Sequence, residues 1–221
     1  MAKFAVVFDM DGVIADNMFY HRKAWEKFFQ KYNPDMDIDE FIQHLGKPNK
    51  DLLTMLFGNT MTAEKIKDLG KEKEALYRKI YAPEVAPLPG FIPFLRSLKK
   101  TGVKTAVATA APKDNLDFLL EHIDMKEKFE ALIDVSEVTK GKPDPEIYLK
   151  AAEKLDFLPE SCLVFEDSLA GIQAARNAGM KVIGVATTNP PEKLQHTDLV
   201  IHDFTEISLE KIFALMTPQT S

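Results

Sequence analysis

Two aspartates near the N-terminus stand one residue apart at the end of an apolar segment. Residues 4–8 are Phe, Ala and Val, a composition typical of a buried strand, and Asp9, Met10 and Asp11 follow. If the chain is still extended there, Asp9 and Asp11 point to the same side, roughly 6 to 7 Å apart. Gly12 then allows a sharp turn. The pair could act together on one ligand, or could be two ordinary turn residues.

The later part of the chain predicts the framework that would position such a pair. Segments with strand composition are expected at residues 104–109, 131–135, 162–165, 181–185 and 199–201. Segments with helical spacing are expected at residues 91–100, 116–122, 146–155, 169–178 and 205–216. Because strands alternate with helices, we expect right-handed β-α-β units and an α/β fold with a doubly wound, mainly parallel sheet.

The segment that follows the first strand shows only helical spacing. Helices are expected at residues 19–32, 39–45, 52–57 and 63–81, and no strand pattern occurs between residues 16 and 83. Pro83, Pro87, Pro89 and Gly90 then mark a change in composition that suits a hinge. We therefore expect an α/β core domain of residues 1–15 and 84–221, with an all-helical domain of residues 16–83 inserted into it.

The polar residues are expected to meet at one edge of the sheet, because ligands of open α/β sheets bind outside the carboxyl ends of the strands. The candidates near those ends are Asp9, Asp11, Thr109, Lys142, Glu166 and Asp167. Four clustered carboxylates would repel one another and raise each other's pKa, so we expect a cation among them. An all-oxygen set of ligands suits a hard ion, Mg²⁺ before Ca²⁺ or Mn²⁺.

Lys142 stands in a segment that would fix its ammonium group. Pro143 restricts the backbone of Lys142 to extended conformations, and Asp144 can cap the next helix with Pro145 at its first position. A hydroxyl from Thr109, a lysine, a metal ion and a helix N-terminus would together bind a phosphate group. Taken singly, Thr109 could fill a strand, Lys142 could be solvated, and the acids could favour a helix start. Their common position at the sheet edge favours function.

The overall composition excludes several classes of protein. The 221 residues carry a net charge of −6, which argues against a nucleic-acid-binding surface. The sequence has no apolar stretch long enough for a bilayer and no signal-peptide layout. The single cysteine, Cys162, begins a predicted strand and is interpreted as a small core residue. We therefore expect a cytoplasmic monomer with neither nucleic-acid nor membrane partners.

The motifs, in this order, resemble those of the haloacid dehalogenase superfamily of phosphotransferases. The four matching motifs are residues 9–13, Thr109, Lys142 before Pro-Asp-Pro, and Glu166 with Asp167. The resemblance implies the Rossmann-like core of that superfamily, with the helical segment as its type 1 cap. Residues 9–25, which include His21 and Trp25, are similar to the β-phosphoglucomutase-like subfamily and its phosphatase relatives.

The resemblance also implies a role for each matched residue. Asp9 would attack the phosphorus and become a transient aspartyl phosphate, which divides one transfer into two easier steps. Asp11 would protonate the leaving oxygen and later deprotonate the acceptor. Mg²⁺ would be held by Asp9, the backbone carbonyl of Asp11 and Asp167, with support from Glu166. The transferring phosphoryl group would be held by Thr109, the amides from Ala110 onward, and Lys142.

Substrate choice is expected from the helical segment. The candidates there are His21, which matches a cap residue of the mutases, and the loop residues Gly46, Lys47 and Lys50. By the spacing from His21, the substrate-binding lysine of the mutases falls at Leu45, and the arginine that binds a second phosphate falls at Asn49. A nearby lysine does not reproduce the bidentate grip of an arginine.

We therefore expect a Mg²⁺-dependent phosphatase that acts on a small phosphorylated metabolite such as a sugar phosphate. The alternative is a hexose-phosphate mutase of the β-phosphoglucomutase type, which has to bind a second phosphate. A non-catalytic binding protein is a more remote alternative, because no motif residue is missing. Dehalogenation is not expected, since it has no use for Asp11 or for a metal site.

Overall fold

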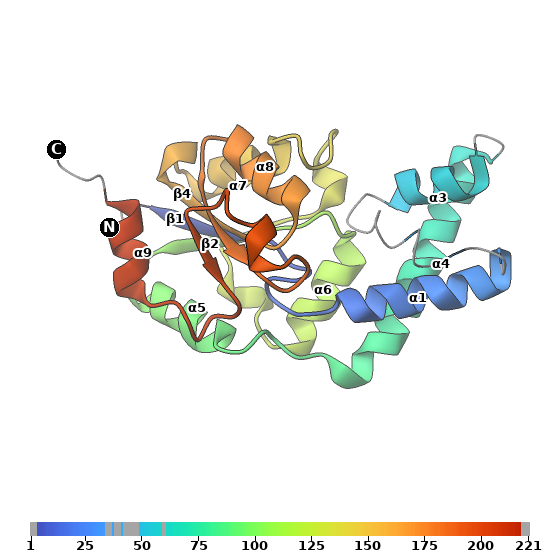
Figure 1. Cartoon of the computed structure of the whole chain (residues 1–221), viewed down its shortest axis with the longest axis horizontal. Helices are drawn as coiled ribbons and strands as arrows, with labels where there is room; N and C mark the ends of the chain where they lie inside the picture. The colour runs from blue at the N-terminus through green and yellow to red at the C-terminus, as the bar shows by residue number, and fades with distance from the viewer. Residues whose placement is uncertain (1–3, 34–36, 38–40, 42–48, 59–60, 218–221) are drawn as a thin grey trace. The chain divides into compact units, whose positions relative to one another are not determined.

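The chain divides into two compact units. The computed structural model describes residues 4–33, 37, 41, 49–58 and 61–217. One unit, here called the core unit, comprises Met1–Asp16 and Ala86–Ser221, and the other, the helical unit, comprises Asn17–Val85. Among the described residues, all strands belong to the core unit (Figure 1).

The core unit is built on a six-stranded parallel sheet, which confirms the predicted α/β class. The strands are β1 (Ala5–Phe8), β2 (Lys104–Ala108), β3 (Ala131–Ile133), β4 (Cys162–Glu166), β5 (Lys181–Val185) and β6 (Leu199–Ile201). Their order is β3-β2-β1-β4-β5-β6. In β1, Ala5 pairs with Lys104 of β2 on one side and with Cys162 of β4 on the other. The order therefore reverses between β1 and β4, where ligands of such sheets bind.

Helices cover both faces of this sheet (Figure 1). They are α5 (Phe91–Lys100), α6 (Lys113–His122), α7 (Glu146–Leu155), α8 (Leu169–Asn177) and α9 (Leu209–Met216), with short 3-10 turns η3 (Lys126–Lys128), η4 (Val135–Glu137), η5 (Pro159–Ser161) and η6 (Pro191–Lys193). Because side chains alternate along a strand, Val7 packs in a cluster with α7 and α8, whereas Phe8 faces away from it. Phe8 stacks on Phe165 at 5.2 Å and meets Phe91 of α5 edge-on at 5.4 Å.

The helical unit has its own aromatic core. Its helices are α1 (Met18–Tyr32), α3 (Asn49–Phe57) and α4 (Ala63–Tyr81), followed by the 3-10 turn η2 (Ala82–Glu84). The apolar faces of these helices enclose Trp25, Phe28, Leu53 and Leu69. Thr62 caps α4 by accepting a hydrogen bond from the Lys65 amide at 3.2 Å.

Several predicted boundaries were wrong by a few residues. β3 ends at Ile133 rather than at residue 135, because the Asp134 carboxylate accepts from the Ser136 amide at 2.8 Å and starts a turn. α9 begins at Leu209 rather than at residue 205, with Ser208 as its N-cap. α6 begins three residues earlier than predicted, at Lys113. The helix predicted at 39–45 lies outside the described residues, apart from Phe41.

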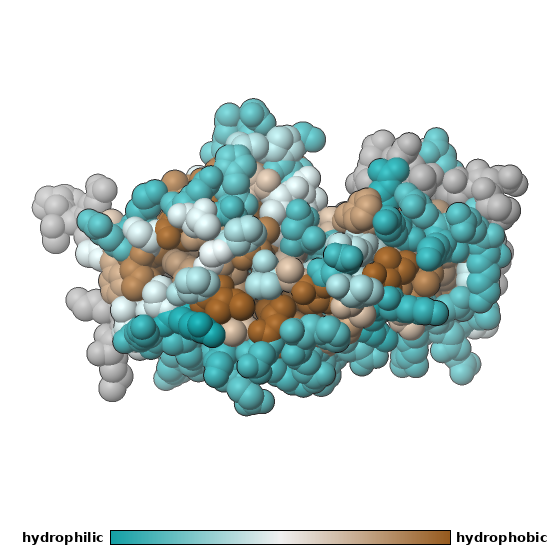
Figure 2. All heavy atoms as spheres, turned by 90° about the horizontal axis from the view of Figure 1, so that it is seen from below, coloured by the Kyte–Doolittle hydropathy of each residue, from teal (hydrophilic) through white to brown (hydrophobic). Residues whose placement is uncertain are grey.

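The face shown in Figure 2 carries mostly hydrophilic side chains, with hydrophobic side chains exposed between them. Among the described residues, no helix combines the length and the apolar character needed to cross a membrane.

We predict that Gly90 is needed for more than its backbone conformation. Gly90 has φ +76°, and a Cβ there would lie 2.6 Å from the carbonyl carbon of Phe204. Gly102 has nearly the same φ, +75°, but its Cβ would meet no described atom within 4 Å. Gly102→Ala should therefore cost only the left-handed strain, about 1–2 kcal/mol. Gly90→Ala should cost about 1–3 kcal/mol more, because of overpacking.

Urea denaturation of the two variants beside the wild type measures both losses as free energies of unfolding. Equal losses for Gly90→Ala and Gly102→Ala would contradict the close approach of residues 90 and 204.

Candidate active site

The Lys142 ammonium joins two strands at the centre of the carboxyl edge of the sheet. Its Nζ lies 2.6 Å from Asp9 Oδ1, directly after β1, and 2.5 Å from Glu166 Oε1, at the end of β4. The side chains of Lys142, Asp9 and Glu166 are 8%, 9% and 0% exposed. The distances are those of charge-assisted hydrogen bonds, so three charges from distant parts of the chain form one buried cluster.

Glu166 is held by hydrogen bonds to both of its carboxylate oxygens. Its Oε2 accepts from the Ser168 amide at 2.7 Å and from the Ser168 hydroxyl at 3.0 Å. Its Oε1 accepts from the Tyr148 hydroxyl of α7 at 3.0 Å. Gly171 of α8 leaves room for this carboxylate, since a Cβ there would lie 1.6 Å from Oε1. The position of the Glu166 charge is therefore fixed before any ligand binds.

Three carboxylates converge beside the lysine. Asp9, Glu166 and Asp167 each place one oxygen within 4.8 Å of the others, and all three residues are buried. Burial and the neighbouring acids raise the pKa of Asp9 to about 8, although Lys142 acts in the opposite direction. Burial, Glu166 and Asp9 likewise raise the pKa of Asp167 well above its ordinary range. Although burial opposes it, Lys142 holds the pKa of Glu166 below its ordinary value.

Burial and the neighbouring acids both disfavour the ionised forms of Asp9 and Asp167, so added positive charge would stabilise those forms. Among the described residues, Lys142 is the ammonium group within hydrogen-bonding distance of the triad, and it is shared between Asp9 and Glu166. A divalent cation would restore the ionised forms of Asp9 and Asp167, since an opposite charge nearby favours the charged form. The donors are all carboxylate oxygens, which suit a hard cation. The residues present therefore fit a divalent metal ion.

Asp11 lies next to this triad in the turn that follows β1. The residue is half-buried, and its backbone forms an isolated bridge with Ala15. The turn continues through Gly12 at φ +81°, as the sequence predicts, and the Ile14 amide donates to Met10 O at 2.9 Å. A Cβ on Gly12 would lie 2.1 Å from Asp167 Oδ2, so a glycine is required by space as well as by conformation.

Thr109 and Ala110 follow β2 at the same edge. The predicted strand includes Thr109, but β2 ends at Ala108 and Thr109 begins the loop. The Thr109 amide continues the sheet by donating to Ile133 O at 3.0 Å, and its buried hydroxyl accepts from the Ala111 amide at 3.0 Å. The hydroxyl therefore shapes the loop and can still donate its own proton to a ligand.

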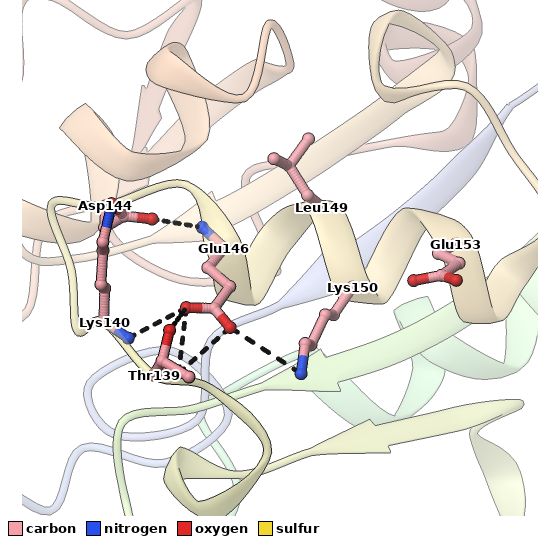
Figure 3. A pocket seen from close by; sticks show the side chains of 7 residues that line it. All are labelled: Thr139, Lys140, Asp144, Glu146, Leu149, Lys150 and Glu153. Carbon is pink, nitrogen blue, oxygen red and sulfur yellow. Dashed lines mark hydrogen bonds and ion pairs between the residues drawn. The ribbon is translucent and has the colours of Figure 1, made fainter.

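A side chain at the start of α7, that of Glu146, is hydrogen-bonded to the loop that carries Lys142 (Figure 3). The Glu146 carboxylate accepts from the Thr139 amide, the Thr139 hydroxyl and the Lys140 amide at 2.8–3.1 Å. These residues line a surface depression of about 410 Å³ with Lys150 and Glu153. The Glu146 carboxylate is already hydrogen-bonded to the loop. We therefore interpret the residues that line the depression as supports of this loop, not as a binding site for a ligand.

The start of α7 differs by one residue from the prediction. Asp144 does accept from the Glu146 amide, at 3.1 Å, but Pro145 is the N-cap and Glu146 the first helical residue. Asn177, at the end of α8, donates to Pro143 O at 3.0 Å. The residues on either side of Lys142 are thus tied to both α7 and α8.

The candidates of the helical unit form a separate arrangement. His21 of α1 stacks on Tyr77 at 3.8 Å, and its Nδ1 lies 3.0 Å from the buried Lys73 ammonium. Lys73 pairs with Glu74 Oε1 at 2.8 Å, and the same oxygen accepts from Asn49 Nδ2 at 2.6 Å. Although burial opposes it, Lys73 and His21 lower the pKa of Glu74 to about 2.

The loop candidates of the helical unit are only partly described. Lys50 is exposed in the first turn of α3, whereas Gly46 and Lys47 lie outside the described residues. The Asn49 side chain is engaged within the unit by Glu74.

Sequence reasoning missed two groups of residues near the triad. Tyr148 lies inside a helix with ordinary amphipathic spacing, and nothing in its local sequence distinguishes its hydroxyl. Thr187, Thr188 and Asn189 follow β5, and the rule that selected Thr109 and Glu166 would have found them. The Thr188 hydroxyl acts as a hydrogen-bond donor that lowers the pKa of the Asp167 carboxyl, against the effect of burial.

Comparisons with known proteins show which family the sequence matches. A family model described as haloacid dehalogenase-like hydrolase matches residues 5–179. β-Phosphoglucomutase of Bacillus subtilis is 33% identical over 215 residues, which cover 93% of this chain and 92% of that protein. Fructose-1-phosphate phosphatase of Escherichia coli is 32% identical over 180 residues, covering 81% of this chain and 95% of the relative.

A solved structure extends the agreement to the fold. The crystal structure of a haloacid dehalogenase hydrolase of family IA, variant 3, from Entamoeba histolytica superposes with a TM-score of 0.88 at 31% identity. The match covers 96% of this chain and 99% of that one. The family predicted from the four motifs is therefore confirmed.

We predict that the Glu146 carboxylate stabilises the segment that leads to Lys142. Glu146→Ala should lower the urea midpoint of unfolding, because it leaves the Thr139 and Lys140 amides without their acceptor. Glu146→Gln should have a smaller effect, because its amide oxygen can take the place of Oε2. Glu153→Ala is the matched control on α7, where the described residues offer its side chain no hydrogen bond. If all three variants unfold at the same midpoint, the bracing role is refuted.

The raised pKa of Asp9 predicts a pH-dependent stability in the absence of metal. The pKa of Asp9 is raised from 3.8 to about 8, so between these two pH values the folded state binds more protons at Asp9 than the unfolded state does. The free energy of unfolding should therefore fall across this range as the pH rises. Asp9→Asn does not titrate, so its stability relative to the wild type should increase with pH in EDTA.

Urea denaturation of both proteins at about pH 5 and about pH 8 measures this difference. Added MgCl₂ should reduce it, because a cation favours the ionised carboxylate. A difference that is the same at both pH values in EDTA would contradict the assignment.

Proposed function

This chain belongs to the haloacid dehalogenase-like hydrolase family, and from that membership we propose that it is a Mg²⁺-dependent phosphatase of small phosphorylated metabolites such as sugar phosphates. The observation that carries the proposal is the Lys142 ammonium at 2.6 Å from Asp9, beside the triad of buried carboxylates. Such a site joins a nucleophile to positive charge for a phosphoryl group.

In the first step, an ionised Asp9 oxygen attacks the phosphorus of the substrate. A bond forms between this oxygen and phosphorus, and the bond from phosphorus to the substrate oxygen breaks. Asp11 gives its proton to the departing oxygen, so that the product leaves as an alcohol. In the second step, Asp11 takes a proton from water, which attacks the aspartyl phosphate and releases inorganic phosphate and Asp9.

The other candidate residues of the core unit would position the phosphoryl group and the metal ion. Lys142 offers its ammonium to the phosphoryl oxygens, and Thr109 offers its hydroxyl with the backbone that follows at Ala110. Asp9 and Asp167, with the backbone carbonyl of Asp11 and support from Glu166, would hold Mg²⁺. The bound ion would supply positive charge that offsets the repulsion between a carboxylate and a phosphate group.

The helical unit is proposed as the cap domain that chooses the substrate. A phosphatase, unlike a mutase, has no need of a second phosphate-binding group. At position 49, where the mutases would place an arginine, the side chain is a neutral amide that donates to Glu74 at 2.6 Å. This observation supports the phosphatase. The alternative, a hexose-phosphate mutase, is supported by the 33% identity to a β-phosphoglucomutase.

A screen of phosphorylated metabolites with MgCl₂, run with and without a bisphosphorylated hexose, tests the proposal. We expect release of inorganic phosphate from several sugar phosphates, independent of the bisphosphate. Isomerisation of β-glucose 1-phosphate without net phosphate release would identify a mutase instead. Halide release from a haloacid without metal would overturn phosphoryl transfer, and no turnover with any substrate would leave a binding protein.

We predict that Asp9→Asn lowers kcat by at least about a thousandfold, because an amide cannot form the phosphoenzyme. Acid-quenched protein should carry phosphate in the wild type and none in this variant. Asp114→Asn, on the surface of α6, is the matched control and should keep both properties. Wild-type turnover in Asp9→Asn would exclude Asp9 as the nucleophile.

A further inference from the structure

The loop that follows β5 contacts both of the segments that carry the candidate metal ligands. The Thr187 hydroxyl donates to Gly12 O at 2.6 Å, in the turn after Asp9. Asn189 Nδ2 donates to Asp167 O at 3.0 Å, in the loop after β4. Three consecutive side chains, with Thr188 between these two, therefore connect two segments that are far apart in the sequence.

Thr188 reaches a ligand side chain itself. Its hydroxyl lies near the buried Asp167 carboxylate and, as a hydrogen-bond donor, acts to lower the pKa of that group. Gly12 makes this contact possible, since a Cβ there would lie 2.1 Å from Asp167 Oδ2 and 3.0 Å from Thr188 Oγ1. The hydroxyl and the carboxylate thus meet over a residue that has no side chain.

The order of the strands explains why this loop is available. β5 lies beside β4 on the side away from β1, and Glu166 pairs with Gly184 near the end of β5. The chain therefore leaves β5 at the same edge of the sheet as it leaves β4. The Ala186 amide donates to Ile201 O at 2.8 Å, which ties the beginning of the loop to β6. The loop starts from a fixed point and can hold its neighbours in place.

We propose that Thr187, Thr188 and Asn189 are positioning residues of the metal site, with Thr188 orienting the Asp167 carboxylate toward the ion. Thr187 and Asn189 hold the two backbone segments that carry the ligands, at Gly12 and at Asp167. The inference rests on the proposed function, because it assumes that Asp9 and Asp167 bind a divalent cation. Partners that orient metal ligands typically change metal affinity about 10- to 100-fold when they are removed.

The test is the binding of Mg²⁺ alone, without substrate. A titration with MgCl₂, followed by the rise in Tm, gives an apparent Kd for each protein. Thr188→Val keeps the shape of the side chain but removes the hydroxyl, and should weaken Mg²⁺ binding by about 10-fold or more. Thr188→Ser retains the hydroxyl and should restore binding close to that of the wild type.

Thr197→Val is the matched control in the same β5–β6 connection. The Thr197 hydroxyl is hydrogen-bonded to backbone carbonyls, Leu194 O and Leu199 O, and not to a candidate ligand. This substitution should lower the Tm without metal and leave the Kd for Mg²⁺ unchanged. Equal Kd values for Thr188→Val and the wild type would overturn this inference while leaving the metal site intact. A wild-type Tm that does not respond to MgCl₂ would overturn the metal site and this inference together. The acid-quench experiment with Asp9→Asn would then still test the nucleophile of the proposed function separately.

Discussion

The Lys142 ammonium lies between two buried carboxylates, and the arrangement of the candidate active site depends on that contact. It is 2.6 Å from Asp9 and 2.5 Å from Glu166, where little water can screen the charges. Loss of one partner of a buried ion pair generally costs about 3–5 kcal/mol, because the other charge is left uncompensated. Here a third carboxyl group, Asp167, lies beside the pair, and burial with the two neighbouring acids raises its pKa well above the ordinary range. The cluster is thus a poor arrangement for stability and a suitable one for binding a cation and a phosphate group.

The surrounding structure keeps these charges in place without neutralising them. Glu166 is fixed by Ser168 and Tyr148, and the loop of Lys142 is fixed by Glu146 and Asn177. Each of these supporting groups is neutral or lies outside the cluster. The cluster therefore holds more carboxyl groups than cations, and a bound cation would favour their ionised forms, as a preorganised electrostatic site requires.

The helical unit also buries a lysine, but there the lysine is paired with a single acid among the described residues. Its buried Lys73 has a matched acid, Glu74, and its ammonium also lies 5.1 Å from the centre of the Trp25 ring. The buried charge of Lys73 is therefore balanced by its neighbour Glu74. The contrast supports the proposal that the core unit performs the chemistry and that the helical unit chooses the substrate.

The sequence by itself determined the strand–helix alternation, the fold class and the family. Those conclusions depend on local composition and on motif residues such as Asp9 and Lys142, which are visible in one dimension. Only the tertiary structure decided which side chains support them. The hydroxyl of Tyr148 reaches Glu166 because α7 packs over β1, the neighbour of β4, and Thr188 approaches Asp167 because β5 lies on the other side of β4. Such contacts depend on which strands are adjacent and on how closely a glycine lets two segments approach. Neither property is contained in the spacing of residues along the chain.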